Sequence, residues 1–197
     1  MTAVLLYTSN QHKISEISHV FSDVSVDICL PATMNVETGV AETGQTFVEN
    51  ALIKARDGCK KTNLPCLADD SGLWVDKIKA PGLYSSRYAG DHATSSMNMD
   101  KLLDALKPIP KEGYKATFYC CLVLLRSVDD PLPLIAEATW SGMVIGEKKG
   151  SNGFGYDPIF YLPELGKTAA ELNPQIKQQI SHRGQALKAM KSMIQLL

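Results

Sequence analysis

The sequence predicts a mixed α/β fold, a central sheet with helices on both faces. Two observations support this: short apolar segments alternate with helical segments in the first half, and two long strand-like segments follow each other across a short turn in the middle. The chain has 197 residues, 45% hydrophobic and 21% charged. This composition predicts a single globular domain over residues 1 to 197 with enough apolar material for a core.

The first half predicts the order strand, helix, strand, loop. Residues 3 to 7 are an apolar run typical of a buried strand, and apolar residues at helical spacing follow over residues 14 to 21. Residues 26 to 30 predict a second strand. Residues 31 to 45 are rich in Pro, Thr, Gly and Glu and predict a loop.

A second helix has a clear start. Thr46 and Glu49 have capping-box spacing, and helix formers continue to about residue 61, with Lys54 inside the helix. Beyond it, apolar residues flank Asp69-Asp70-Ser71-Gly72 on both sides. We interpret these four residues as a tight polar turn between two strands.

The rest of the chain predicts a helix, a hairpin and a final helix. The helix covers residues 95 to 106, with Ser95 or Thr94 as its cap. Residues 117 to 126 and 134 to 140 predict the hairpin. The final helix begins near residue 181 and continues to the last residue, 197.

Charge and cysteine content exclude several classes of protein. The net charge of −1 offers no basic surface for nucleic acid, and the longest apolar run, residues 118 to 125, is far below the roughly 20 residues of a membrane-spanning helix. The five cysteines lack a C-x-x-C spacing, and the first residues lack the pattern of a secretory leader. We therefore expect reduced thiols, no zinc site and a cytoplasmic protein.

The first candidate site follows the first strand. It combines hydroxyls, an amide, a cation and the amino end of a helix, a combination that suits phosphate. The alternative is that Ser9 or Asn10 only caps the helix and that Lys13 is solvated. The segment does not have the spacing of a Walker P-loop. Its residues are Thr8, Ser9, Asn10, Gln11, His12 and Lys13.

The second candidate site is the pair of carboxylates Asp69 and Asp70. Carboxylates among apolar residues need a partner, and Mg²⁺ held by one or two carboxylates, water and substrate phosphates would provide one. A carboxylate beside the metal could also activate water. Glu42 could be a second metal-binding carboxylate. The alternative is an Asp-rich turn that caps local amides, with Glu42 solvated.

The third candidate site is a glycine-rich loop over residues 151 to 158. Its glycines allow close backbone approach to a ligand, and its two aromatic rings could stack on a flat base. The loop could instead be a bulge with its rings in the core. The residues concerned are Phe154, Gly155, Tyr156 and Asp157.

The last candidate residues surround the start of the final helix. Lys177 precedes Ser181, a plausible cap, and His182 and Arg183 follow. The guanidinium of Arg183 suits an exocyclic carbonyl oxygen or a phosphate. Exposure to solvent is the alternative for these cations.

Seven segments in collinear order resemble the inosine triphosphate pyrophosphatase family, and its branch of bacterial noncanonical purine nucleoside triphosphate pyrophosphatases in particular. The pairing of the fifth and seventh segments, SNGFGYDPIF with SHRGQAL, is more specific than any single segment. The segments are TSNQHK (8–13), AETGQTFVENALIKAR (41–56), LADDSGL (67–73), APGLYSSRYAG (80–90), SNGFGYDPIF (151–160), GKTAAEL (166–172) and SHRGQAL (181–187).

The resemblance implies an activity and an architecture. The activity is hydrolysis of inosine, deoxyinosine and xanthosine triphosphates between the α and β phosphates, which requires Mg²⁺ and releases a monophosphate and pyrophosphate. The architecture is a homodimer of chains with a twisted mixed sheet and two lobes, the nucleotide lying in the cleft between them.

The resemblance also implies roles for individual residues. Residues 8 to 13 would cradle phosphate, with Lys13 and Lys54 stabilising its charge. Asp70 would orient or deprotonate the attacking water and hold the metal with Glu42. The residues implied to contact the substrate's other parts are Ser71, Phe154, Gly155, Tyr156, Asp157, Lys177, His182 and Arg183.

One position departs from the family pattern, which commonly has glycine where this chain has Ser9. A positive φ is costlier for serine than for glycine. If the phosphate turn needs that geometry, we expect strain or a changed backbone path at Ser9, with a modest effect on affinity.

Three other functions compete with this reading. The chain could be a related pyrophosphatase for another modified base, such as a methylated pyrimidine. It could be a nucleotide-binding regulator without turnover, although the paired carboxylates disfavour that. A sequence-independent nucleic-acid binder is disfavoured by the charge balance.

Overall fold

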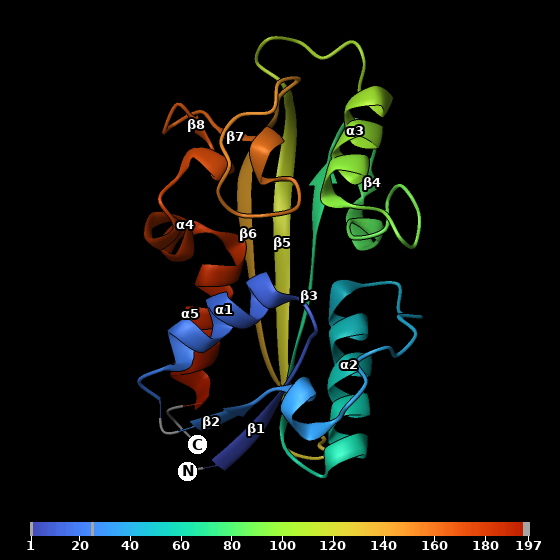
Figure 1. The fold of residues 1–197 in the computed structure, drawn as a ribbon, viewed down its shortest axis with the longest axis vertical. Coiled ribbons are helices and arrows are strands. Elements are labelled where there is room, and N and C mark those ends of the chain that lie inside the picture. Colours follow the sequence, from blue (N-terminus) through green and yellow to red (C-terminus); the bar gives the residue numbers. More distant parts are fainter. Residues whose placement is uncertain (1, 25, 195–197) are drawn as a thin grey trace. The chain divides into compact units, whose positions relative to one another are not determined.

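A computed structural model describes residues 2–24 and 26–194 of the chain. Within these residues the strands form one eight-stranded sheet in the order β2-β1-β3-β5-β6-β7-β8, with β4 paired to β3 (Figure 1). β1 is parallel to β2 and to β3, whereas β7 is antiparallel to β6 and to β8. The sheet is therefore mixed, and with the helices around it the predicted α/β class is confirmed.

The bounds of the elements are as follows. The strands are β1 (Thr2–Tyr7), β2 (Val26–Cys29), β3 (Cys66–Val75), β4 (Ala80–Pro81), β5 (Tyr114–Leu125), β6 (Leu134–Val144), β7 (Phe160–Leu162) and β8 (Lys167–Thr168). The α-helices are α1 (Gln11–Phe21), α2 (Phe47–Thr62), α3 (Ser95–Ala105), α4 (Pro174–Ile180) and α5 (His182–Ile194). The 3-10 turns are η1 (Pro31–Met34), η2 (Gly82–Tyr84), η3 (Asp157–Ile159) and η4 (Ala169–Glu171).

The chain forms two compact units. Unit 1 contains residues 1–70, 120–138 and 183–197, and unit 2 contains residues 71–119 and 139–182. Strands β3, β5 and β6 contribute residues to both units, so neither unit is a continuous stretch of chain. The single domain and the substrate cleft expected from the sequence stay predictions.

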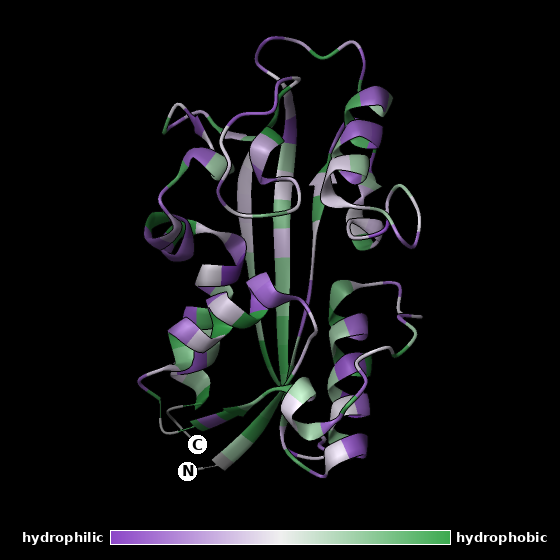
Figure 2. Ribbon diagram, viewed as in Figure 1, coloured by the Kyte–Doolittle hydropathy of each residue, from purple (hydrophilic) through white to green (hydrophobic). Residues whose placement is uncertain are grey.

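The core of unit 1 packs α1 and α5 against one face of its strands, while α2 lies on the other face (Figure 1). Leu6 of β1, Ile17 of α1 and Leu187 of α5 are fully buried in this core. In Figure 2 the strands of this unit are largely hydrophobic, whereas the helices alternate between hydrophobic and hydrophilic residues. This pattern is typical of amphipathic helices that cover a buried sheet.

The core of unit 2 gathers around α3 and the ends of β3, β5 and β6. Leu102 of α3 and Leu73 of β3 are fully buried there. Phe118, Trp140 and Phe160 add an aromatic group, with the Phe118 and Phe160 ring centroids 4.6 Å apart.

Three predicted helix starts are confirmed. The Thr46 hydroxyl accepts from the Glu49 amide, and the Glu49 carboxylate accepts from the Thr46 amide, which completes the capping box of α2. Thr94 caps α3 by accepting from the Met97 amide. The final helix starts at His182 and is described to residue 194, so the predicted end at residue 197 lies outside the described residues.

The predicted turn at residues 69 to 72 is wrong. These residues lie inside the continuous ten-residue strand β3. Asp69 and Asp70 are both buried, and each pairs with cationic side chains from other elements. Those partners satisfy the carboxylates within the sheet, so the strand continues where the local composition favours a turn.

Two further findings concern the whole described chain. No helix in the residues covered by the structure has the length and hydropathy needed to cross a bilayer. All five cysteines lie within the described residues as free thiols, and four of them are buried.

Candidate functional site

The segment at residues 8 to 13 joins β1 to α1. The Asn10 side chain accepts hydrogen bonds from the amides of His12 and Lys13, at 3.0 and 3.2 Å, and thereby caps α1. The cap at Asn10 is therefore confirmed, while its role in binding phosphate stays a prediction. Lys13, in contrast, is not simply solvated, because its ammonium forms an ion pair with Asp69.

Ser9 shows no left-handed backbone. Among the non-glycine residues that the structure describes, positive φ angles occur only at Asn35, Asn63 and Lys79. The positive-φ strain considered for Ser9 is thus not found.

Asp69 is the centre of a buried ionic group within unit 1. Its carboxylate pairs with the Lys13 ammonium and accepts from Arg183 Nε at 2.9 Å and from the Cys120 thiol at 3.3 Å. Burial alone would raise the pKa of Asp69, but the charges of Lys13 and Arg183 and their hydrogen bonds hold it well below its usual range. Asp69 is therefore an anion at neutral pH that fixes both cations.

Arg183 is itself buried and held from two sides. Its Nη1 donates to Glu16 Oε2 at 2.8 Å, while its Nε donates to Asp69. Burial opposes the charged form, but the Asp69 and Glu16 carboxylates raise the pKa of Arg183 above its usual value. The guanidinium therefore has a fixed orientation.

A second ionic group lies beside it on β3. Lys54 of α2 donates to Asp70 Oδ1 at 2.6 Å and to Glu42 Oε1 at 3.1 Å. Burial raises the pKa of Asp70 above its usual value, against the effect of the Lys54 ammonium, and the Glu42 charge adds to the rise. Burial would lower the pKa of Lys54, but the charges of Asp70 and Glu42 raise it overall. Two carboxylates thus converge on one ammonium, and Asp70 has the higher proton affinity expected of a base.

The donor set in unit 1 fits a divalent cation. Three cations, Lys13, Lys54 and Arg183, contact four carboxylates, so the groups themselves supply no excess of positive charge for a polyphosphate. No cluster of three metal-ligating side chains occurs among the described residues. Mg²⁺ is commonly held by one or two carboxylates together with water and substrate phosphates, and Glu42 with Asp70 offers such a pair.

The glycine-rich loop in unit 2 forms a third group. Asp157 Oδ2 accepts from Lys177 Nζ at 2.5 Å and from the Phe154 amide at 2.8 Å. The Lys177 ammonium also lies over the Phe154 ring, 5.1 Å from its centroid. Gly153 has a φ of +74°, and a Cβ there would overlap Asp157 Oδ2. Glycine at this position lets the loop close over the buried ion pair.

The other candidates in unit 2 are packed into the protein. The Tyr156 hydroxyl donates to the Ser85 carbonyl at 2.8 Å, and Tyr156 is buried. The His182 ring stacks on Phe118 with 4.6 Å between centroids and 6° between planes. Ser71 lies in β3, half-buried.

The structure therefore brings the candidate residues into definite groups. Lys13 and Arg183 meet on Asp69, and Glu42 and Asp70 meet on Lys54, all in unit 1. Phe154, Asp157 and Lys177 meet in unit 2. Their roles toward a substrate stay predictions.

Sequence reasoning considered Asp69 only as a possible metal-binding carboxylate and did not identify Glu16, whereas in the structure Asp69 pairs with Lys13 and Arg183 and Glu16 pairs with Arg183. A signal for Glu16 was available, because it lies one helical turn after Lys13 on α1. For Asp69 the signal was its place in an apolar run, which indicates a buried and hence paired carboxylate.

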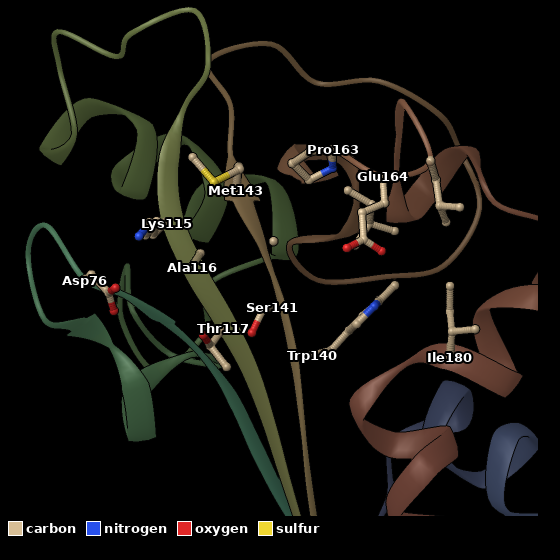
Figure 3. A pocket seen from close by; sticks show the side chains of 13 residues that line it. Asp76, Lys115, Ala116, Thr117, Trp140, Ser141, Met143, Pro163, Glu164 and Ile180 are labelled. Carbon is tan, nitrogen blue, oxygen red and sulfur yellow. The ribbon is translucent and has the colours of Figure 1, made fainter.

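A separate pocket in unit 2 contains none of the candidate residues. It has a volume of about 730 Å³ and lies along β5 and β6, with Lys115, Thr117, Trp140 and Ser141 among its lining residues (Figure 3). It is therefore not where we expect a nucleotide.

A mixed sheet whose strand β3 carries two buried carboxylates, each paired with cations of the neighbouring helices, defines an α/β protein with a site suited to a charged ligand. The chain belongs to the Ham1 family, which it matches over residues 4–193.

Named relatives and solved structures agree with this assignment. The chain is 49% identical over 191 residues to the dITP/XTP pyrophosphatase of Photorhabdus laumondii, and the match covers 96% of each protein. It is 48% identical to the dITP/XTP pyrophosphatase of Escherichia coli strain K12, again over 96% of each. A HAM1 protein from Coxiella burnetii matches with a TM-score of 0.92 and 43% identity over 100% of both chains. A nucleoside-triphosphatase / dITP/XTP pyrophosphatase from Mycobacterium abscessus matches with a TM-score of 0.76 and 40% identity, over 98% of this chain and 100% of that one.

Proposed function

We propose that this chain hydrolyses noncanonical purine nucleoside triphosphates, namely ITP, dITP and XTP, to the monophosphate and pyrophosphate, and so removes them from the nucleotide pool. The observation that carries the proposal is the Lys54–Asp70–Glu42 group, a buried ion pair joined by a half-buried second carboxylate and suited to a metal-bound phosphate. The names of the dITP/XTP pyrophosphatase relatives support the choice of substrate.

The polyphosphate would bind to unit 1. Lys13 and the capped start of α1 offer a cation and amide dipoles to phosphate oxygens, and Lys54 adds a second cation. Negative charge increases on these oxygens during hydrolysis, so fixed cations stabilise the transition state more than the ground state. The contacts that fix Lys13 and Lys54 before substrate arrives are therefore part of the catalytic apparatus.

We assign Mg²⁺ to Asp70 and Glu42. When bound, the ion would neutralise phosphate charge and polarise the phosphoryl group. Asp70 would orient the attacking water and take its proton at a carboxylate oxygen, for which its raised pKa is suited.

Base recognition is assigned to the candidate residues of unit 2, and the family resemblance adds Arg183. Phe154 offers a ring for stacking, and Asp157 and Lys177 hold the loop that carries it. Hypoxanthine and xanthine have an acceptor oxygen at C6, whereas adenine has an amino donor. A donor from Arg183 or a nearby backbone amide would therefore favour the former and disfavour adenine. Ser71, Gly155, Tyr156 and His182 complete the proposed substrate-binding residues.

The proposal includes a homodimer in the cytoplasm, with no membrane or nucleic-acid partner. The support is the family membership, the free thiols and the near-neutral charge. Sedimentation velocity of the purified chain measures the dimer directly, and a monomer at micromolar concentration would remove this part of the proposal.

A substrate panel tests the activity. The purified chain is incubated with Mg²⁺ and ITP, XTP, GTP, ATP or a methylated pyrimidine triphosphate, and pyrophosphate and orthophosphate are measured separately. We expect pyrophosphate from ITP and XTP and little product from ATP. Orthophosphate release, or preference for the pyrimidine, would replace the proposed reaction. Binding without turnover would identify a nucleotide-binding regulator instead.

A further inference from the structure

Four polar residues form a stripe along α2. Asn50, Lys54, Asp57 and Lys61 are spaced by four, three and four residues, which places them on one face of the helix. Only Lys54 of these has a role in the proposed reaction. Asn50 and Lys54 are buried, and buried polar groups on a helix need hydrogen-bonding partners.

The partners belong to the loop before the helix. Lys61 Nζ donates to the Glu37 carbonyl at 2.7 Å, Lys54 Nζ to Glu42 Oε1 at 3.1 Å, and the Gly44 amide to Asn50 Oδ1 at 2.8 Å. The loop therefore runs back along α2, from its last turn to its first (Figure 1). Glu42 lies between the two outer attachments.

The attachment at Gly44 is a close one. A Cβ at Gly44 would lie 2.6 Å from Glu49 Cβ and 2.7 Å from Asn50 Oδ1, so only glycine allows the loop this near to the helix. Asn50 is 1% exposed. The Glu49 carboxylate accepts from the next two amides, Gln45 and Thr46, at 2.7 and 2.9 Å.

The attachment at Glu37 also includes β1. Asp57 accepts from Lys61 at 2.6 Å and from the Tyr7 hydroxyl. Burial and the Asp57 carboxylate raise the pKa of Tyr7, so its hydroxyl keeps the proton that it donates. Tyr7 is the last residue of β1, directly before the segment that starts at Thr8.

We propose that Asn50, Asp57 and Lys61 are positioning residues that fasten residues 37–44 to α2 and hold Glu42 against Lys54 before a nucleotide binds. Through Tyr7, the same residues fix the start of the segment at residues 8 to 13 relative to α2. None of the three touches substrate. The effect of Glu42 placement on catalysis rests on the proposed function, whereas the attachment of residues 37–44 to α2 does not depend on it.

Hydrogen exchange of the full-length chain, free of metal and nucleotide, tests the fastening. Amide exchange in peptides covering residues 36–46 is compared in the unmodified chain, Lys61→Met and Lys60→Met. Both lysines are exposed, and both variants lose one charge on the last turn of α2, but it is Lys61 that donates to the loop, at the Glu37 carbonyl. We expect Lys61→Met to exchange at least about fivefold faster in this loop, the effect of losing one hydrogen bond, and Lys60→Met to match the unmodified chain. Equal exchange in all three would overturn the proposal.

Asn50 variants provide a second arm. Asn50→Ala removes the acceptor of the Gly44 amide, whereas Asn50→Asp keeps an oxygen there, so exchange at Gly44 should rise in the first and stay low in the second. If Asn50→Ala does not fold, as judged by circular dichroism, Tyr7→Phe replaces it. That variant loses only the hydroxyl that donates a hydrogen bond to Asp57. Unchanged loop exchange in the folded variant counts against the proposal.

Kinetics separate positioning from a merely structural role. With ITP and Mg²⁺, we expect Lys61→Met to lower kcat by about tenfold, with KM changed less than about twofold, because Glu42 is displaced while the phosphate-binding residues remain. Equal loss of kcat in Lys60→Met would refute the assignment. If the unmodified chain hydrolyses no triphosphate, the proposed function fails, and the exchange measurement still decides the fastening.

Discussion

Asp69 and Asp70 are adjacent, yet their proton affinities shift in opposite directions. Successive side chains of a strand point to opposite faces of the sheet. Asp69 accordingly meets Lys13 of α1 and Arg183 of α5, whereas Asp70 meets Lys54 of α2. Burial raises the pKa of both carboxyls. At Asp69 two cations outweigh burial and the pKa falls, whereas at Asp70 burial prevails over the single Lys54 ammonium, the Glu42 charge adds to it, and the pKa rises. The pleat of β3 thus separates a structural anion from a candidate base.

Replacing Asp70 with Asn tests the candidate base. The amide is nearly isosteric but cannot accept the proton of water, so we expect turnover of ITP to fall by about 10²- to 10⁴-fold. Nucleotide binding, measured by calorimetry with Mg²⁺ and a nonhydrolysable ITP analogue, should remain measurable because Lys13 and Lys54 are intact. Near-normal turnover would remove Asp70 from this role.

Replacing Asp69 with Asn tests the structural anion. The change leaves Lys13 and Arg183 without their shared carboxylate, and breaking a buried ion pair typically costs about 3–5 kcal/mol of unfolding free energy. Urea unfolding in metal-free buffer at pH 7 measures the loss. Asp100→Asn, which removes a half-exposed partner of Lys148, serves as the control and should change stability much less.

The acid side of the stability curve gives an independent measure of Asp69. Because its folded-state pKa is depressed, Asp69 stabilises the fold above the usual carboxyl pKa of about 3.9, and this stabilisation is lost as the pH falls toward the folded-state value. The unmodified chain should therefore lose more stability than Asp69→Asn between pH 5 and about pH 3. Parallel curves for the two proteins would contradict a depressed pKa.

At the scale of elements, the sequence predicted those features that depend on contacts between residues close together in the chain. The capping box of α2 and the Thr94 cap of α3 depend on atoms within four residues, so the sequence pattern was sufficient. The same holds for the run of apolar residues in β1. The segments at residues 8 to 13 and 151 to 158 could also be identified as candidate sites from the sequence, because their polar, charged and glycine residues suit ligand binding.

The wrongly predicted turn in β3 shows that the local sequence does not reveal partners that are distant in the chain. Two carboxylates and a glycine favour a turn, but Lys13 and Arg183 lie 56 and 114 residues away from Asp69 in the chain. Only the folded sheet brings these cations to the strand. Helix α4 was missed for a related reason: it has seven residues, too few for a clear apolar period.

The glycine-rich loop at residues 151 to 158 supports a prediction at the scale of one element. Gly153→Ala would place a Cβ on Asp157 Oδ2, in a backbone conformation with φ +74° that alanine rarely adopts. The Asp157–Lys177 pair must then separate, and Phe154 loses its backbone anchor. We expect KM for ITP to rise by about tenfold or more, with the melting temperature lowered by a few degrees.

Gly166→Ala is the control for this prediction. Gly166 lies between β7 and β8 and also has a positive φ, +63°, but a Cβ there meets no atom within 4 Å. It therefore carries comparable backbone strain without a clash and at a position with no assigned contact to substrate. An equal rise in KM for both variants would show that backbone strain in unit 2, and not the loss of the Asp157–Lys177 pair, weakens binding.

At the scale of the molecule, two hydrophobic cores share three strands. The core of unit 1 and that of unit 2 contain different residues, but β3, β5 and β6 supply residues to both. Both tryptophans of the chain, Trp74 and Trp140, belong to unit 2. Tryptophan fluorescence therefore reports the unfolding of unit 2 alone, whereas far-ultraviolet circular dichroism reports both units.

A substitution in the core of unit 1 tests whether the two cores unfold together. Leu187→Ala leaves a cavity at a fully buried position in unit 1, which typically costs about 2–5 kcal/mol. Strands β3, β5 and β6 run through both cores, so unfolding one core breaks the backbone hydrogen bonds of strands that also belong to the other. We therefore expect the urea midpoint measured by fluorescence to fall together with the midpoint measured by circular dichroism. Leu132→Ala, the same change at a 70% exposed position of unit 1, should move neither. The fluorescence midpoint could instead stay unchanged while the circular dichroism signal divides into two steps. That result would show that unit 2 unfolds on its own, in spite of the shared strands.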